Sequence, residues 1–346
     1  MTVLKGFIVL LIATALGSSL HAAAPQPSDV RAAVQNSIPF LQEKGVWWIE
    51  KKDCVSCHRV TNMVWTLSAA KGRGFKVSDE LDEWISWSIE SSLSKNDEDK
   101  IVGLSNKEGV AQLLIGVGDV LDEDSYQRLA ALLTKDQQED GSWKAGGQLP
   151  AQKRPKPETN QTSTMWLSLA MQQKQPGDQE KPVLDKAGQF IETTAEGKST
   201  EWFALRLLLA SQLDDGKTRD QMVKRLVKQQ KSDGGWGWMV DAESDALGTG
   251  MAIYALAQSN DPEAQAAIER GQSFLMETQR DDGSWPVKGT KEKRKDKVAE
   301  TAVYWGTAWA ALALIETLPE TGPIQARQDN PVEQVDVAKA PTDQTP

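Results

Sequence analysis

The chain is poor in the residues on which most cofactor and nucleic-acid sites depend. Its 346 residues include only two cysteines and two histidines. No GxGxxG or GxxxxGK phrase occurs, so the sequence predicts neither a dinucleotide-binding nor a phosphate-binding loop. Basic residues are outnumbered as well, with 39 Lys and Arg against 49 Asp and Glu, a formal net charge of −10 and a pI near 5.0. A chain of this charge is not expected to bind nucleic acid or anionic lipid electrostatically.

Long apolar runs are also scarce, and the one that occurs lies at the N-terminus. Lys5 precedes an apolar run from Phe7 to Gly17, and the small residues Ala22 to Ala24 follow. This order is typical of an export signal, and the run is too short to span a membrane comfortably. We predict a signal peptide at 1–24, a linker at 25–29, and a periplasmic or otherwise exported protein with no membrane span after cleavage; retention as an uncleaved anchor is the alternative.

Tryptophan is the one aromatic residue in excess, with thirteen copies against three Tyr and six Phe. Three of them end a phrase of Gln, two residues, Asp-Gly, one residue and Trp, at Gln137–Trp143, Gln230–Trp236 and Gln279–Trp285. Asp-Gly favours a helix-ending turn, because Gly adopts the left-handed conformation at little cost and Asp bonds the turn backbone. The Trp can pack across a neighbouring helix with its N–H satisfied. We interpret the phrase as a structural link between repeats.

Apolar residues recur at helical spacing in six pairs of segments, and the second segment of each pair is the more apolar one. The phrase recurs after 93 and then 49 residues, so a pair with a decayed phrase, marked by Glu196-Gly197 and Trp202, fits between its first two copies. The expected pairs are 30–48 with a helix through 63–70, 79–92 with 107–121, 124–135 with 162–172, 182–194 with 200–212, 218–230 with 247–258, and 262–278 with 298–317.

Six such hairpins can close into a ring whose second helices line the inside. The phrase and its helix pairs resemble the repeats of the squalene-hopene cyclase and protein prenyltransferase superfamily. The resemblance covers roughly residues 30–318 and implies an all-α, (α/α)6 toroid. The segment 319–346 has almost no large apolar residue, so a disordered, polar and acidic tail is expected there.

Both cysteines lie in one phrase, Cys54-Val55-Ser56-Cys57-His58, which is the attachment signature of c-type haem. Thiols on one helical turn can reach the two vinyl groups of a haem, and His58 can present its imidazole to the iron as an axial ligand. We predict a covalent haem c, electron transfer or another redox function, and a redox partner protein. The alternatives are a Cys54–Cys57 disulfide and a zinc site, although zinc needs about four ligands and these three are all that the mature chain offers.

The sixth position of such an iron has few candidates. His21 lies in the predicted signal, so no second histidine remains and bis-His ligation within one chain is excluded. Met239, in the loop after the second phrase, is our candidate, with an open or water-bound iron as the alternative. If Trp65 corresponds to Trp166, Tyr254 and Trp309 on the other second helices, His58 falls at the start of the first inner helix, which places the haem at one mouth of the ring.

The resemblance also implies a competing activity, because squalene-hopene cyclases protonate a hydrophobic substrate with an acid from a DxDD phrase at the start of an inner helix. Asp241, Glu243 and Asp245 stand before 247–258, but these acids alternate with other residues and do not form a DxDD phrase. In the cyclase alternative one of them is the acid, and the ligand is a terpenoid or another hydrophobic small molecule. They can equally cap the helix. A toroid that only binds a ligand is the third alternative.

Other charged residues of the second helices receive simpler interpretations. Glu158, Glu201 and Glu300 head or precede inner helices, where capping explains them as well as a place in the mouth does. The basic run 288–297 is expected to be a solvated loop. Prenyltransferase activity is not expected, because the late Cys and His of that zinc site are missing.

Overall fold

The computed structural model describes residues 24–55 and 59–319. The predicted signal peptide, the residues Ser56, Cys57 and His58, and nearly all of the predicted tail lie outside this range and stay predictions. In the described part the chain forms thirteen α-helices and four short 3-10 helices, without a β-strand. None of the described helices is both long and apolar enough to cross a membrane.

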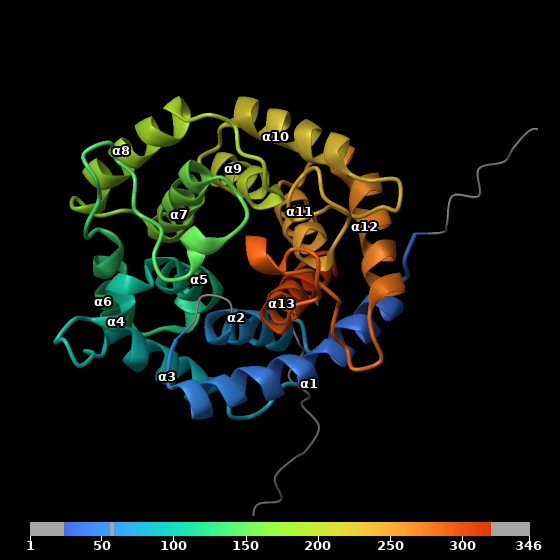
Figure 1. Ribbon diagram of the computed structural model, residues 1–346, viewed down its shortest axis with the longest axis horizontal. Helices are drawn as coiled ribbons and strands as arrows, with labels where there is room; N and C mark the ends of the chain where they lie inside the picture. The colour runs from blue at the N-terminus through green and yellow to red at the C-terminus, as the bar shows by residue number, and fades with distance from the viewer. Residues whose placement is uncertain (1–23, 56–58, 320–346) are drawn as a thin grey trace, which may run out of the picture.

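The helices form two concentric rings (Figure 1). The outer helices are α1 (Pro27–Lys52), α3 (Leu81–Leu93), α6 (Glu123–Leu133), α8 (Glu180–Thr193), α10 (Gly216–Gln229) and α12 (Gln265–Thr278). The inner helices are α2 (Val60–Gly72), α5 (Lys107–Val117), α7 (Lys156–Met171), α9 (Thr200–Gln212), α11 (Ala246–Gln258) and α13 (Glu300–Glu316). The short helices are α4 (Val102–Ser105), η1 (Gly118–Val120), η2 (Leu149–Ala151), η3 (Pro262–Ala264) and η4 (Glu292–Arg294).

Inner helices contact one another in the order α2, α5, α7, α9, α11 and α13, and α13 packs against α2 again. The inner ring is therefore closed, and the predicted (α/α)6 toroid is confirmed. Several helix boundaries differ from the prediction by a few residues, most of all at the start of α7, which begins at Lys156 instead of 162; α1 begins inside the expected linker. Both helices have a proline in the first turn, where its missing N–H costs nothing.

Each glutamine of the repeated phrase joins its own turn to the next outer helix. Its Nε2 donates to the glycine carbonyl of the phrase and to a carbonyl of the following outer helix. The interhelical pairs are Gln137 with Val183, Gln230 with Ala267 and Gln279 with Ala33, each at 2.8 Å. The third pair joins α12 to α1, so the phrase also closes the outer ring between the last and the first helix pair.

The aspartate, glycine and tryptophan of each phrase have equally regular contacts. Gly141, Gly234 and Gly283 have φ values of +87°, +87° and +79°, the left-handed region that glycine favours. The three Asp side chains accept from the N–H two residues ahead at 3.0 Å. The three indoles are at most 1% exposed and donate to carbonyls in the last turn of the preceding outer helix or just after it. The predicted structural role is confirmed, except that Trp202 of the decayed copy lies within α9.

Four aromatic side chains from four inner helices fill the middle of the ring. They are Trp65, Trp166, Tyr254 and Trp309, the residues that the sequence aligned, with ring centroids 5.5 to 6.3 Å apart. Most of these pairs are edge-to-face, an arrangement that aromatic quadrupoles favour. This aromatic cluster separates a pocket beside the first turns of α13 from a pocket among the last turns of the inner helices. We name the end of the ring where the inner helices begin the N-terminal mouth, and the opposite end the C-terminal mouth.

Candidate functional site

Acidic residues occupy the start of five of the six inner helices at the N-terminal mouth. A helix N-terminus carries a partial positive charge, which favours carboxylates there. The sixth inner helix, α2, begins after the cationic residue Arg59. The five acids are Glu108 of α5, Glu158 of α7, Glu201 of α9, Asp245 before α11 and Glu300 of α13.

Two of these acids hold backbone groups in place. Glu158 accepts hydrogen bonds from the backbone N–H groups of Lys198 (2.9 Å) and Ser199 (2.8 Å), and so fixes the loop before α9. Asp245 is the N-cap of α11: its carboxylate accepts from the N–H groups of Gly248 (2.8 Å) and Trp238 (2.9 Å). Burial raises the pKa of Asp245, although these hydrogen bonds oppose the shift. The capping alternative that the sequence left open therefore describes the contacts of Asp245.

The other two acids of the cyclase alternative lie on the surface. Asp241 and Glu243 are exposed, and Glu243 pairs with Lys288 of the basic run at 2.7 Å. The hydrogen bond and the charge of Lys288 lower the pKa of the Glu243 carboxyl. The structure thus does not bring the three acids together around one cavity.

A buried ionic cluster lies between α5, α7 and α9. Arg154 pairs with Glu201, and their side chains are 0% and 1% exposed. Trp166 donates its indole N–H to the same Glu201 carboxylate at 3.0 Å, and Ser163 donates to Glu108 at 2.8 Å. Burial, together with the charge of Glu201, raises the pKa of Glu108 to about 7, and Arg154 offsets only part of this shift. Glu108 therefore carries its proton at slightly acid pH.

Arg59 joins the start of α2 to α13. Its guanidinium pairs with Glu300 and lies 4.6 Å from the ring centre of Tyr304 and 5.0 Å from that of Trp48. Only 2% of the Arg59 side chain is exposed, whereas Glu300 is largely open to solvent. The charge of Glu300 is thereby compensated within the protein.

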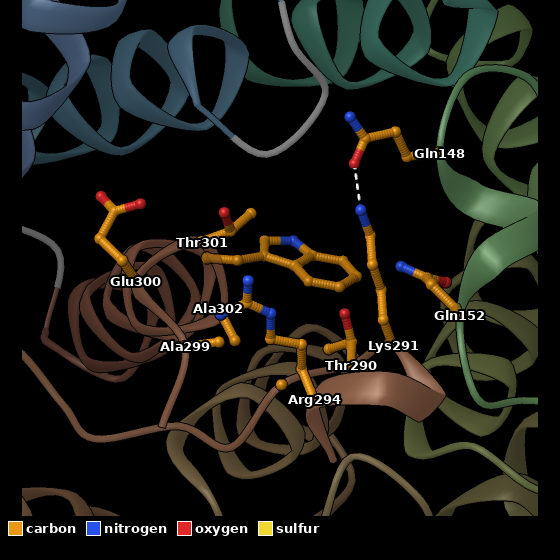
Figure 2. Close-up of a pocket in the computed structure, with 11 residues that line it drawn as sticks. Gln148, Gln152, Thr290, Lys291, Arg294, Ala299, Glu300, Thr301 and Ala302 are labelled. Carbon is orange, nitrogen blue, oxygen red and sulfur yellow. Dashed lines mark hydrogen bonds between the residues drawn. The ribbon is translucent and has the colours of Figure 1, made fainter. Parts of the chain in front are cut away.

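The main pocket of the N-terminal mouth has a volume of about 290 Å³ and lies against the first turns of α13 (Figure 2). The loop before α7 contributes Gln148 and Gln152, and the basic run 288–297 contributes Lys291 and Arg294. Trp305 of α13 lines it as well. Figure 2 shows Lys291 and Glu300 on opposite sides, with Arg294 between them and a hydrogen bond from Lys291 to Gln148. The basic run is mostly exposed, as predicted, but two of its cations reach this pocket.

The predicted haem-binding residues lie only partly within the described chain. Cys54 is exposed; desolvation and the neighbouring Asp53 raise the pKa of its thiol. Cys57 and His58 lie outside the described residues. On one side of them the Val55 carbonyl accepts from Asn106, just before α5, at 3.1 Å, and on the other Arg59 contacts α13. Val55 within the motif and Arg59 directly after it therefore both lie at the N-terminal mouth.

Met239, the methionine predicted as the sixth iron ligand, and three methionines of the inner helices occupy different places. Met239 is partly buried, and its backbone forms a bridge with Ser199 near the start of α9, so it lies at the N-terminal mouth. Met63, Met165 and Met251 are core residues with at most 1% exposure.

Sequence reasoning did not identify Glu108, Arg154 or Trp305. A signal for Glu108 existed, because acids at the starts of the later inner helices predict an acid at the matching position of α5. Arg154 and Trp305 had no such signal. Arg154 stands in a loop between helices, and its partner Glu201 is 47 residues away in sequence.

Comparisons with known proteins support the α/α toroid fold. Residues 204–327 match the model of the squalene-hopene cyclase C-terminal domain, which is well under half of the chain. No curated protein matches the sequence. A complex of the type II terpene cyclase MstE from Scytonema with merosterolic acid A has a TM-score of 0.58 and 16% identity, covering 85% of this chain and 98% of the cyclase.

Hydrolases are as similar to this chain in structure as the terpene cyclase is. A family 88 glycosyl hydrolase from Bacteroides vulgatus has a TM-score of 0.57 at 11% identity, covering 85% of this chain and 99% of the hydrolase. An unsaturated glucuronyl hydrolase variant from Streptococcus agalactiae has a TM-score of 0.58 at 10% identity, covering 87% and 93%. Identities this low establish the fold alone, and one fold hosts many functions. The chain is thus a cyclase-like α/α toroid, with a squalene-hopene cyclase match confined to its C-terminal part.

Proposed function

We propose that this protein binds an amphipathic organic acid in the N-terminal mouth pocket. The observation that supports this proposal is an indole and two cations on the walls of one cavity: Trp305, Lys291 and Arg294. An aromatic ring packs against an apolar ring system, and a guanidinium forms paired hydrogen bonds with a carboxylate. Because Arg59 already compensates Glu300, the two cations of the pocket are available to an acidic ligand.

The size of the pocket and the complexes of related folds guide the choice of ligand. At about 290 Å³ it lies just below the usual range of small-molecule pockets, about 300–1,000 Å³. MstE has been captured with merosterolic acid A as product and with geranylgeranyl dihydroxybenzoate as substrate. A terpenoid that bears an acidic group is therefore the first ligand class for this chain.

We propose ligand binding here, not proton-initiated cyclisation. None of Asp241, Glu243 and Asp245 lines this pocket. The carboxylate of Asp245 accepts two backbone hydrogen bonds, and Asp241 and Glu243 are exposed. A general acid must lie within hydrogen-bond reach of the atom that it protonates, so their positions do not favour that role.

Calorimetric titration with a diterpenoid carboxylic acid and with its methyl ester tests this proposal. The acid is expected to bind about tenfold more tightly than the ester, since the ester loses about one charge-assisted pair. Replacing Arg294 by Met should weaken binding of the acid by a similar factor and leave the ester unaffected. Lys293→Met is the matched control, because Lys293 is exposed on the same loop but does not line the pocket. Equal affinities for acid and ester, or equal losses in both variants, would contradict the proposal.

A covalent haem c is a second candidate, and the positions of Val55 and Arg59 favour it. Val55 and Arg59 bring the chain to the mouth that carries the cationic pocket, and haem is itself an amphipathic acid with two propionates. Cys54 and Cys57 would hold the haem, His58 would ligate the iron, and Met239 would be the sixth ligand. Haem would supply a one-electron redox couple for an exported partner protein. Lys291 and Arg294 have the charge to pair with propionates.

Protein matured in the periplasm of a host with c-type attachment machinery tests this second candidate. A Soret band that survives denaturation is expected, together with its loss when both Cys54 and Cys57 are replaced by Ser. Met239→Ala should then open the iron to carbon monoxide. Colourless wild-type protein would refute haem attachment. Unchanged binding of the diterpenoid acid by the double Ser variant would show that the pocket acts without haem.

A further inference from the structure

The C-terminal mouth holds a second pocket that the proposed function does not use. Its volume is about 410 Å³, and it lies among the last turns of the inner helices, on the other side of the aromatic cluster. Its lining comprises three aromatic residues, three aliphatic residues and four uncharged polar residues. They are Trp65, Trp166 and Tyr254; Ile115, Leu169 and Leu208; and Gln173, Ser211, Gln212 and Gln258.

Hydrogen bonds fix polar side chains of this pocket, but some of their hydrogen-bonding atoms have no partner. Gln212 donates its amide to the Gln172 carbonyl at 2.6 Å, which fixes the side chain, and its own Oε1 is buried without a partner. The neighbouring Ser211 hydroxyl is likewise buried without a partner. Gln258 donates to the Tyr254 hydroxyl at 3.3 Å. Buried polar atoms without partners are uncommon because they cost free energy, so these two residues point to a missing polar partner.

The lining limits the class of ligand. None of the residues that line the pocket is charged, and Glu316 lies close enough to Tyr254 to add to the rise that burial causes in the pKa of its hydroxyl, so an anionic ligand would lose its hydration and gain no counter-charge. A purely apolar ligand would cover four polar side chains and leave their groups unpaired. The pocket therefore suits a neutral molecule that has an apolar face and several hydroxyl groups.

We infer that the C-terminal mouth binds an uncharged mono- or disaccharide. The C–H face of a pyranose can pack on the apolar part of this lining, which comprises Ile115, Leu169 and Leu208 and the small exposed parts of Trp65, Trp166 and Tyr254. Its hydroxyl groups both donate and accept, which matches amide and hydroxyl side chains that do the same. The volume lies within the usual range for small-molecule sites, about 300–1,000 Å³. This site is separate from the proposed acid-binding pocket, because the aromatic cluster lies between them.

Saturation-transfer NMR with the full-length protein tests this inference. Maltose and cellobiose are the probes, with glucuronate as a charged comparison and adenosine as a neutral aromatic one. At least one disaccharide should bind more tightly than glucuronate and adenosine. Gln258→Leu and Gln173→Leu should each weaken that binding about tenfold, whereas Gln265→Leu, on the exposed face of α12, should not. Absence of sugar binding, or tighter binding of adenosine, would overturn the inference.

A second measurement covers variants that fail to fold. A photoreactive derivative of the bound disaccharide should label wild-type peptides containing 208–212 or 254–258. Labelling confined to peptides containing 289–305 would place the sugar at the N-terminal mouth and refute the assignment. The diterpenoid acid should not compete with the sugar, and competition would also contradict two separate sites.

Discussion

Replacing Glu108 by Gln is expected to stabilise the protein above about pH 7 and to change its stability little below about pH 4.5. Burial and the charge of Glu201 raise the pKa of Glu108 from 4.5 to about 7 in the folded chain, so the folded state binds the proton more tightly than the unfolded state. The favourable contribution of this proton is complete below the unfolded pKa and is lost as pH rises through the folded pKa. A shift of this size corresponds to about 3 kcal/mol.

Urea unfolding followed by tryptophan fluorescence, at pH values below and above this window, measures the effect. Gln keeps the shape of the side chain and an oxygen that can accept the hydrogen bond from Ser163, so the variant removes chiefly the titration. Glu98→Gln is the matched control, because Glu98 is exposed and should show no such difference. A free-energy change for Glu108→Gln that is equal at both pH values would show that Glu108 does not titrate in this window.

Gly283→Ala is expected to destabilise the toroid by at least about 3 kcal/mol, because it combines a strained backbone with a steric overlap. Gly283 has a φ of +79°, and a Cβ there would overlap the carbonyl oxygen of Asn36 in α1. The overlap lies where Gln279 joins α12 to α1, so relief requires the closing contact of the ring to move. The backbone of α1 cannot yield as a flexible side chain would.

Gly147→Ala separates the two contributions. Gly147 also has a positive φ, +54°, but a Cβ there would meet nothing within 4 Å. Its substitution should therefore cost only the backbone strain, about 1 kcal/mol. Denaturant midpoints of the two variants check the prediction. Equal losses at Gly147 and Gly283 would show that the ring closure adapts to the extra methyl group.

The fold was largely predictable because the information that specifies it is local and repeated. A Gln, an Asp-Gly pair and a Trp at fixed spacing make the same contacts at each copy, so the phrase could be interpreted without knowing its neighbours. The sequence also aligned Trp65 with Trp166, Tyr254 and Trp309 at similar steps of the second helices, but only the structure shows that these four residues meet at the ring centre. Helix boundaries were less certain where a proline could start a helix earlier.

The candidate sites were less predictable, because their residues come from loops and helix starts far apart in the chain. Asp245 stood in a cluster of acids, and only its contacts with the Gly248 and Trp238 N–H groups distinguished a helix cap from an acid facing a cavity. Lys291 and Arg294 belong to the basic run 288–297, which the sequence predicted to be a solvated loop. Their place beside Trp305 depends on how that loop folds over α13.

The amino-acid sequence by itself determined the number of helix pairs and the closed ring, because helical periodicity and turn chemistry act within a few residues. It also contains the haem-attachment signature, whose cofactor stays a prediction. The tertiary structure alone decided which carboxylates are neutralised, capped or protonated, since burial and opposite charges set those states. It also decided that the aromatic cluster separates a cationic pocket from an uncharged one, because packing across the ring determines where space remains.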